Sequence, residues 1–258
     1  MKKRNIFALS ILVIFYISYG VILTLFQEKV VYFPDAQDFN KCAYFANAEK
    51  VDFKGTRMYV HDTDKPTIVL YHGNAGSACN RSAYADIFTQ AGYGYIIVEY
   101  TGFSNETATP THAALKYNVQ SVIAYITENK ISDITVIGES IGTGIASYHT
   151  SLSVPNKLLL ISPFTDLKDV AKNRFWFYPT SLLVNNAFDN VANLEKYHNP
   201  ITIIHGTKDS IIPYELGQKL FALLDTQKEF ITITDAGHND LFLFPETYEA
   251  ITNFLLTI

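Results

Sequence analysis

The chain opens with an unbroken apolar stretch. Ile6 to Phe26 contains no charged residue, and at 1.5 Å per residue about 21 helical residues cover a hydrocarbon layer of about 30 Å. The pattern predicts a transmembrane helix over 6–26. A cleaved signal peptide is the rival interpretation, but its apolar region is only about 7 to 15 residues and ends at small residues. A buried core helix is the other alternative, although the stretch is apolar on every side and precedes the first recognisable strand.

Three cations stand before this stretch, namely Lys2, Lys3 and Arg4. Positive residues flanking a span favour the cytoplasmic side. We therefore expect a single-pass membrane protein with a cytoplasmic tail at 1–5. Everything after Gln27 is then expected on the periplasmic, extracellular or lumenal side, with 27–49 as a linker.

From about residue 50 onward, short apolar runs alternate with helical patterns. This alternation is typical of βαβ units, which form a mostly parallel sheet with helices on both faces. We expect strands at 51–53, 58–61, 67–71, 95–100, 134–137, 158–161, 201–204 and 229–233, and helices at 80–90, 110–128, about 215–224, and 246–256. The first two strands are expected to pair antiparallel across a Lys54-Gly55 turn. The catalytic domain is thus placed at 50–258.

One connection is too long for a plain loop. Phe164 to Pro200 carries no clear strand or helix pattern, and insertions of this length in compact domains are usually lids or binding loops. We expect an irregular, short cap at 164–200.

Composition excludes some classes of protein. Of the 258 residues, 48% are hydrophobic and 17% are charged, so the chain can bury a large core and is not disordered. The net charge is −5 and no basic stripe follows the N-terminus. Nucleic-acid binding is therefore not expected. No feature of the sequence indicates an oligomeric state.

The chain has two cysteines, Cys42 and Cys79. In an oxidising compartment they could pair, but sequence does not say whether their Cα atoms come within reach. A disulfide and two free thiols both remain open.

A candidate nucleophile lies at the end of a predicted strand. Gly138-Glu139-Ser140-Ile141-Gly142 fits the G-x-S-x-G pattern, after a β-rich run and before a helix-compatible run. The pattern needs this strand–turn–helix context because the serine sits in a strained turn with backbone packed closely around it. Ser140 is therefore the expected nucleophile.

A serine hydroxyl needs a base within hydrogen-bond reach. His238 follows the predicted 229–233 strand, and Asp209 follows the 201–204 strand. Both should therefore lie with Ser140 at the carboxyl edge of the sheet. The chain order serine, aspartate, histidine is that of α/β-hydrolases and differs from chymotrypsin-type and subtilisin-type enzymes. Asp235 and Asp240 are rival acids, but their closeness to His238 in sequence favours turn or capping roles.

The oxyanion hole is expected to use two backbone N–H groups. One is that of Ile141, directly after the nucleophile, and the other that of Asn74, in the loop after the 67–71 strand. His72 is a tempting second catalytic histidine, but a bracing role is favoured at that position. The histidines and cysteines show no metal-ligand spacing, so we expect neither a metal nor a cofactor.

Taken together, the motifs resemble those of the α/β-hydrolase superfamily, and within it the membrane-anchored, small-cap serine hydrolases of the abhydrolase-domain type. The matching pieces are Val31 to Pro34, His72 to Gly76, Gly138 to Gly142, Ser162 to Phe164, His205 to Asp209 with Pro213, and Gly237 with His238. One departure is visible, because Thr101 stands where such proteins tend to carry a structural arginine. The resemblance implies a serine hydrolase acting on carboxylic esters or thioesters of small-molecule or lipid acyl substrates. An aminopeptidase-like amide hydrolase and a catalytically silent binding domain are the alternatives.

The expected cap contains an aromatic cluster, Phe175-Trp176-Phe177-Tyr178. Aromatic side chains offer large apolar area and prefer membrane interfaces. Phe175 and Trp176 are therefore candidates for binding an acyl chain, although ordinary packing against the sheet is the default for such clusters.

Overall fold

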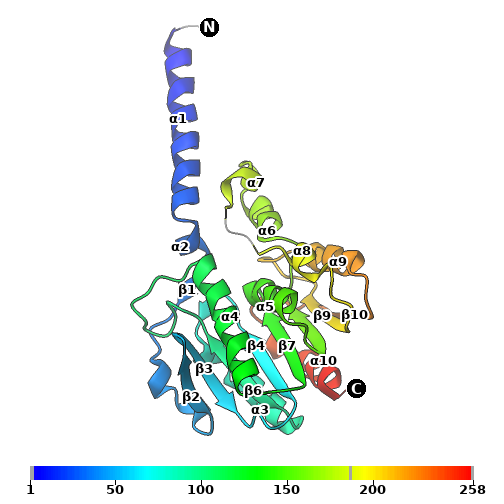
Figure 1. Cartoon of the computed structure of the whole chain (residues 1–258). Coiled ribbons are helices and arrows are strands. Elements are labelled where there is room, and N and C mark those ends of the chain that lie inside the picture. The colour runs from blue at the N-terminus through cyan, green and yellow to red at the C-terminus, as the bar shows by residue number, and fades with distance from the viewer. Residues whose placement is uncertain (1–2, 186–187, 257–258) are drawn as a thin grey trace.

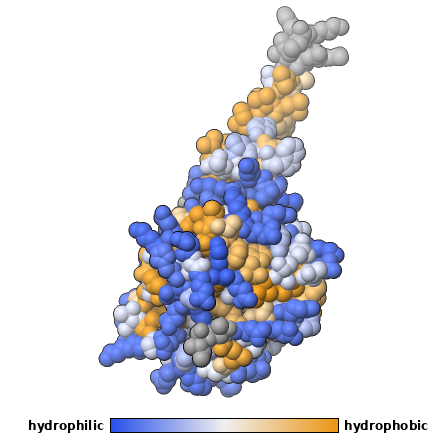
Figure 2. All heavy atoms as spheres, turned by 90° about the vertical axis from the view of Figure 1, so that its right-hand side faces the viewer, coloured by the Kyte–Doolittle hydropathy of each residue, from blue (hydrophilic) through white to orange (hydrophobic). Residues whose placement is uncertain are grey.

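A computed structural model describes residues 3–185 and 188–256, and its first element is a long helix that projects from the body (Figure 1). Helix α1 spans Lys3–Leu25 and is followed by the short α2, Gln27–Val31. Within the described residues, Phe7–Leu25 is a candidate membrane span by length and composition, and almost none of it is buried. In Figure 2 apolar residues crowd the projecting helix, whereas hydrophilic residues predominate on much of the body beneath it.

The body is built on an eight-stranded sheet with strand order β10-β9-β8-β7-β4-β6-β3-β2. The strands are β2 Glu49–Phe53, β3 Thr56–His61, β4 Thr67–Tyr71, β6 Gly94–Glu99, β7 Ile134–Glu139, β8 Lys157–Ile161, β9 Ile201–Gly206 and β10 Lys228–Ile233. Only the β2–β3 and β3–β6 pairs are antiparallel. The mostly parallel sheet predicted from the sequence is confirmed, and several strands extend one or two residues beyond the predicted ends.

Helices cover both faces of this sheet. They are α3 Ser82–Gln90, α4 His112–Glu128, α5 Ile141–Leu152, α9 Tyr214–Leu223 and α10 Pro245–Leu256. Strand β4 shows why two layers form: Val69 and Tyr71 face the core shared with α4, α5 and α9, whereas Ile68 and Leu70 face the core shared with α3 and α10. Side chains alternate along a strand, so a continuous apolar run requires cover on both faces.

The segment 27–49 is not the plain linker expected from the sequence. It contains β1, Phe33–Pro34, which pairs with β5, Ala75–Gly76, and two 3₁₀ turns, Phe39–Lys41 and Ala43–Phe45. Tyr32, Phe39 and Phe45 are buried. Large aromatic side chains gain much from burial, and these three attach the segment to the body.

Cys42 and Cys79 form a disulfide, with Cα atoms 5.8 Å apart. Both cysteines are buried. The bond joins the 27–49 segment to the 3₁₀ turn Ala78–Arg81 that precedes α3.

The expectation of an irregular cap is also corrected. In the described parts of 164–200, namely 164–185 and 188–200, there are three short helices, α6 Leu167–Arg174, α7 Thr180–Leu183 and α8 Asn190–Leu194. Asp166 accepts a hydrogen bond from the Lys168 N–H and Asp189 accepts one from the Ala192 N–H. Such N-cap bonds satisfy donors that a short helix leaves unpaired, so capping rather than apolar periodicity defines α6 and α8.

Candidate active site

Ser140 occupies a strained turn between β7 and α5. Its φ is 56°, in the left-handed region that non-glycine residues rarely adopt. A Cβ at Gly142 would overlap the carbonyl oxygen of Tyr71 at the end of β4. The glycine therefore allows α5 to begin directly against the neighbouring strand, and the turn holds the serine at the carboxyl edge of the sheet.

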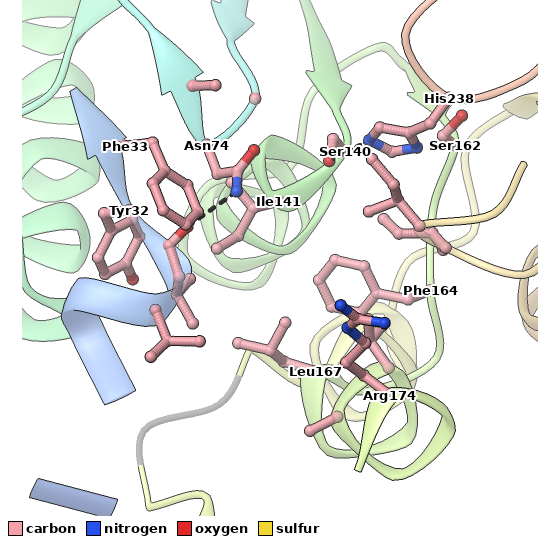
Figure 3. Close-up of a pocket in the computed structure, with 18 of the residues that line it drawn as sticks. Tyr32, Phe33, Asn74, Ser140, Ile141, Ser162, Phe164, Leu167, Arg174 and His238 are labelled. Carbon is pink, nitrogen blue, oxygen red and sulfur yellow. Dashed lines mark hydrogen bonds between the residues drawn. The ribbon is translucent and has the colours of Figure 1, made fainter. Parts of the chain in front are cut away.

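Three of the expected site residues meet at this edge. The Oγ of Ser140 lies 2.9 Å from Nε2 of His238, and Nδ1 of His238 lies 2.7 Å from Oδ2 of Asp209. Asp209 follows β9 and His238 follows β10, so two neighbouring parallel strands bring their loops to the same edge. Figure 3 shows the His238 ring beside Ser140.

The Asp209 carboxylate is held by several donors. Oδ1 accepts hydrogen bonds from the N–H groups of Ile211 and Ile212 at 2.9 and 2.8 Å, and His205 Nε2 lies 3.3 Å from Oδ2. Burial acts to raise the pKa of Asp209, but the bonds from His205 and His238 outweigh it and hold the pKa well below its ordinary value. An ionised Asp209 only accepts hydrogen bonds, so Nδ1 of His238 carries the proton and Nε2 is left to accept from Ser140.

The two rival acids are engaged elsewhere. Asp240 accepts a hydrogen bond from the Gly237 N–H at 2.6 Å. Asp235 pairs with Lys208 at 2.8 Å on the surface. The first contact lies within the loop after β10 and the second joins that loop to the one after β9, and neither carboxylate bonds the His238 ring.

Asn74 is fixed by the segment that follows α1. Its side chain donates to the carbonyl of Val31 at 2.8 Å (Figure 3), and its own carbonyl accepts from the Phe33 N–H at 2.8 Å. Ile141 is the first residue of α5, where a backbone N–H has no acceptor within the helix. Both residues line the same cavity as Ser140.

His72 is packed behind the site. Its ring stacks on Tyr100 with centroids 4.1 Å apart, and its Nδ1 lies 2.8 Å from the Gly73 carbonyl. Tyr100 in turn donates to the His72 carbonyl at 2.8 Å. These contacts brace the loop before Asn74, in agreement with the bracing role favoured from the sequence.

The loop that contains Thr101 is held by side chains from distant elements. Arg57 on β3 donates to the Phe103 carbonyl at 2.6 Å and pairs with Glu106 at 3.1 Å. Asn118 on α4 bonds both the N–H and the hydroxyl of Thr101. Sequence reasoning missed these two residues because neither lies in a motif.

A cavity of about 1430 Å³ opens over Ser140 and His238. In Figure 3 Tyr32, Phe33 and Asn74 lie on one side of it, and the cap residues Phe164, Leu167 and Arg174 on another. The expected aromatic pair is split, because Phe175 lines the cavity whereas Trp176 is 79% exposed and does not. Consecutive residues after α6 point in different directions, which corrects the placement of Trp176 at the acyl-binding wall.

Within residues 3–185 and 188–256, no cluster of three or more His, Cys, Asp or Glu side chains is arranged to hold a metal ion.

The parallel sheet, the strained serine turn and the hydrogen-bonded Ser–His–Asp arrangement define an α/β-hydrolase. No family model matches the chain. The protein bem46 of Schizosaccharomyces pombe is 29% identical over 204 residues, which cover 74% of this chain and 67% of that protein. The lysophosphatidylserine lipase ABHD12 of Xenopus tropicalis is 26% identical over 227 residues, covering 76% of this chain and 59% of the lipase.

A solved structure of a Pyrococcus furiosus esterase superposes with a TM-score of 0.68 at 15% identity, covering 88% of this chain and 97% of the esterase. The chain has the α/β-hydrolase fold, it is similar to lipases and esterases of that fold, and its enzyme class is serine hydrolase.

Proposed function

We propose that the chain hydrolyses carboxylic esters of lipid-like acyl substrates through an acyl-enzyme on Ser140. The observation that carries this proposal is the unbroken hydrogen-bond chain from Ser140 through His238 to Asp209 at the floor of a large cavity. A serine hydroxyl becomes an effective nucleophile only when such a base is in place.

The proposed reaction has two steps. Ser140 Oγ attacks the substrate carbonyl carbon while its proton passes to Nε2 of His238, and the N–H groups of Asn74 and Ile141 hold the oxyanion. Collapse of the tetrahedral intermediate breaks the ester bond, and His238 returns its proton to the leaving alcohol. Water then attacks the acyl-enzyme by the same route, which frees the acid and restores Ser140. Asp209 stays ionised throughout and stabilises the imidazolium. A thioester would follow the same steps with a thiol as leaving group.

The substrate class is supported by the cavity and by the relatives. Apolar side chains such as Phe164, Leu167 and Val170 form much of the cavity wall. One relative is named a lysophosphatidylserine lipase. We therefore propose an ester with a single long acyl chain as substrate. Amide hydrolysis of the aminopeptidase-like kind and a silent binding role are the outcomes that the experiment below distinguishes.

We further propose a single-pass membrane protein with a cytoplasmic N-terminus. The apolar stretch 6–26 and the cations that precede it in the sequence support this topology, although Lys2 lies outside the described residues. The Cys42–Cys79 disulfide supports an oxidising periplasmic, extracellular or lumenal location for the body. The anchor is 6–26, and the catalytic body includes 27–49 as well as 50–258 with its cap at 164–200.

The experiment uses the full chain in detergent beside a Ser140→Ala variant. Both are assayed on p-nitrophenyl esters from acetate to palmitate and on oleoyl lysophosphatidylserine. We expect turnover by the wild type, a preference for long chains, and loss of turnover in the variant. Cleavage of aminoacyl amides but not of esters would favour the amide hydrolase, and no turnover of either by folded protein would favour the binding domain.

A further inference from the structure

The tip of the cap is packed against the middle of the anchor helix. The cap tip is defined here as residues 175–184, from the end of α6 to the residue that follows α7. Tyr178 stacks on Tyr16 of α1 with ring centroids 4.4 Å apart. The Tyr178 hydroxyl donates to the Tyr16 carbonyl at 2.7 Å, and the Tyr16 hydroxyl donates to the Phe177 carbonyl at 2.6 Å. Both hydroxyls are thus satisfied by protein, as burial in hydrocarbon requires.

Gly20 makes this close approach possible. It is the one buried residue in the stretch 7–25 of α1, and a Cβ there would stand 3.0 Å from the Tyr178 ring. Such small residues allow close packing of elements within a membrane. The cap tip therefore packs against α1 at a defined position along the helix, between Tyr16 and Gly20.

That position lies inside the apolar part of α1. Tyr16 and Gly20 are nine and five residues before Leu25, the last residue of the helix, which at 1.5 Å per residue is about 14 and about 8 Å. Half of a hydrocarbon layer is about 15 Å thick. If α1 spans the bilayer, the cap tip reaches into the leaflet nearest the body.

The side chains of the cap tip suit this environment. Trp176, Leu182 and Phe177 are 79%, 77% and 46% exposed. Exposing such large apolar side chains to water is unfavourable, whereas contact with lipid chains would bury them. The polar boundaries agree as well. Polar residues flank the tip in the chain. Arg174, the last residue of α6, stands directly before it, and Asn185 stands directly after it. The Asn185 N–H donates to the side chain of Gln27, just beyond the span.

The cavity extends from this region to the candidate active site. Tyr19 and Leu23 of α1 line it on one side, and Phe175, Phe177 and Leu183 of the cap on another, while Ser140 lies at its floor. Its volume of about 1430 Å³ exceeds the ~300–1,000 Å³ of ordinary ligand pockets. The anchor helix is thus one wall of the cavity as well as a tether.

We propose that the cap tip is inserted in the bilayer beside α1, and that the acyl chain of a membrane lipid enters the cavity sideways between α1 and the cap. The entry route rests on the proposed function, whereas the insertion does not. A lipid molecule then reaches Ser140 without leaving the leaflet for water.

Trp176 provides a direct test of insertion, because it is the only tryptophan of the chain. The full chain is reconstituted in phosphatidylcholine vesicles that contain lipids brominated at shallow or deep acyl positions. We expect bromines in the hydrocarbon to quench the Trp176 emission and aqueous iodide to leave it unquenched, with Trp176→Phe as background. Quenching by iodide on either side of the vesicle, without quenching by bromolipid, would overturn insertion. This readout needs no turnover and therefore stands even where the proposed function fails.

The entry route is tested in the same vesicles by the ratio of oleoyl lysophosphatidylserine turnover to p-nitrophenyl acetate turnover. Leu23→Trp narrows the wall of the cavity, and we expect the ratio to fall about tenfold, which is ~1.4 kcal/mol. Ile22→Trp is the matched control, because Ile22 is 50% exposed and does not line the cavity. Equal ratios in the two variants would overturn the lateral route. Loss of turnover of both esters already in the wild type would instead count against the proposed function.

Discussion

At Asp209, burial and hydrogen bonding act on the carboxyl group in opposite directions. The hydrogen bonds prevail and the pKa stays well below its ordinary value, so the group is an anion at neutral pH. Its Oδ2 is 2.7 Å from Nδ1 of His238. An amide at this position would present a donor as well as an acceptor.

Asp209→Asn is therefore expected to leave the fold intact and to lower kcat by on the order of 10⁴, because the amide can hold His238 in the wrong tautomer. The measurement is kcat and KM on p-nitrophenyl butyrate. Asp235→Asn is the matched control, since Asp235 pairs only with surface Lys208, and should stay close to wild type. A similar loss in both variants would contradict the assignment of Asp209.

His149 on α5 gives a pH-dependent stability. It is fully buried, its Nδ1 lies 2.8 Å from the Tyr71 hydroxyl, and burial lowers its pKa from 6.5 to about 3. At pH values between these two pKa values, the unfolded chain has His149 protonated and the folded chain does not, so the unfolded chain binds one more proton. The free energy of unfolding should therefore fall as the pH drops below 6.5, by on the order of 1 kcal/mol for each pH unit.

His149→Gln removes this proton uptake and keeps a polar partner for Tyr71. We expect the variant to be less stable at neutral pH, and the difference from wild type to shrink as the pH falls to about 4. Urea unfolding of the full chain in detergent at several pH values measures it. Parallel profiles for the two proteins would show that His149 does not carry this dependence.

Sequence reasoning identified the candidate triad better than its surroundings. Ser140 lies in a recognisable G-x-S-x-G motif. Asp209 and His238 each follow a strand that is clear from its apolar run. Because parallel strands end at the same edge of a sheet, the topology alone brings the three residues together. Arg57 and Asn118 were missed because side chains that brace a loop from distant elements leave no local pattern. Phe175 and Trp176 were paired because sequence does not say in which direction consecutive residues point after a helix ends.

At the level of elements, the sheet and its helices follow directly from the pattern of apolar positions. The 27–49 segment and the cap do not, since β1 has only two residues and α6 and α8 depend on Asp166 and Asp189 as caps. Short elements carry too few positions for a periodic pattern. Their form is set by tertiary contacts, of which the Cys42–Cys79 disulfide is one.

Loss of this disulfide should destabilise the body through the 27–49 segment. The two cysteines are 37 residues apart, and closing a loop of that length in the unfolded chain corresponds to about 4 kcal/mol in the chain-entropy description. We expect a Cys42→Ala, Cys79→Ala double variant to lose about 2–4 kcal/mol of unfolding free energy. Urea unfolding measures the loss, and reduced wild-type protein is the control. Equal unfolding free energies for the oxidised wild type and the double variant would show that the disulfide does not stabilise the fold.

At the scale of the whole molecule, helix α1, the cap and the body all line the same cavity. The proposed topology places the body outside the cytoplasm. In spheroplasts of a bacterial host that expresses the full chain, added proteinase should therefore digest the body while a cytoplasmic marker protein stays intact. A body that is protected until the spheroplasts are lysed would reverse the topology.

The central claim is that Ser140 is an activated nucleophile, and a fluorophosphonate probe tests it most directly. The full chain in detergent is treated with the probe and digested, and the modified peptide is located by mass spectrometry. The account predicts one adduct on Ser140, none in Ser140→Ala, and much slower labelling in His238→Ala. Equal labelling of the Ser140→Ala variant, or no labelling of the folded wild-type chain, would contradict it.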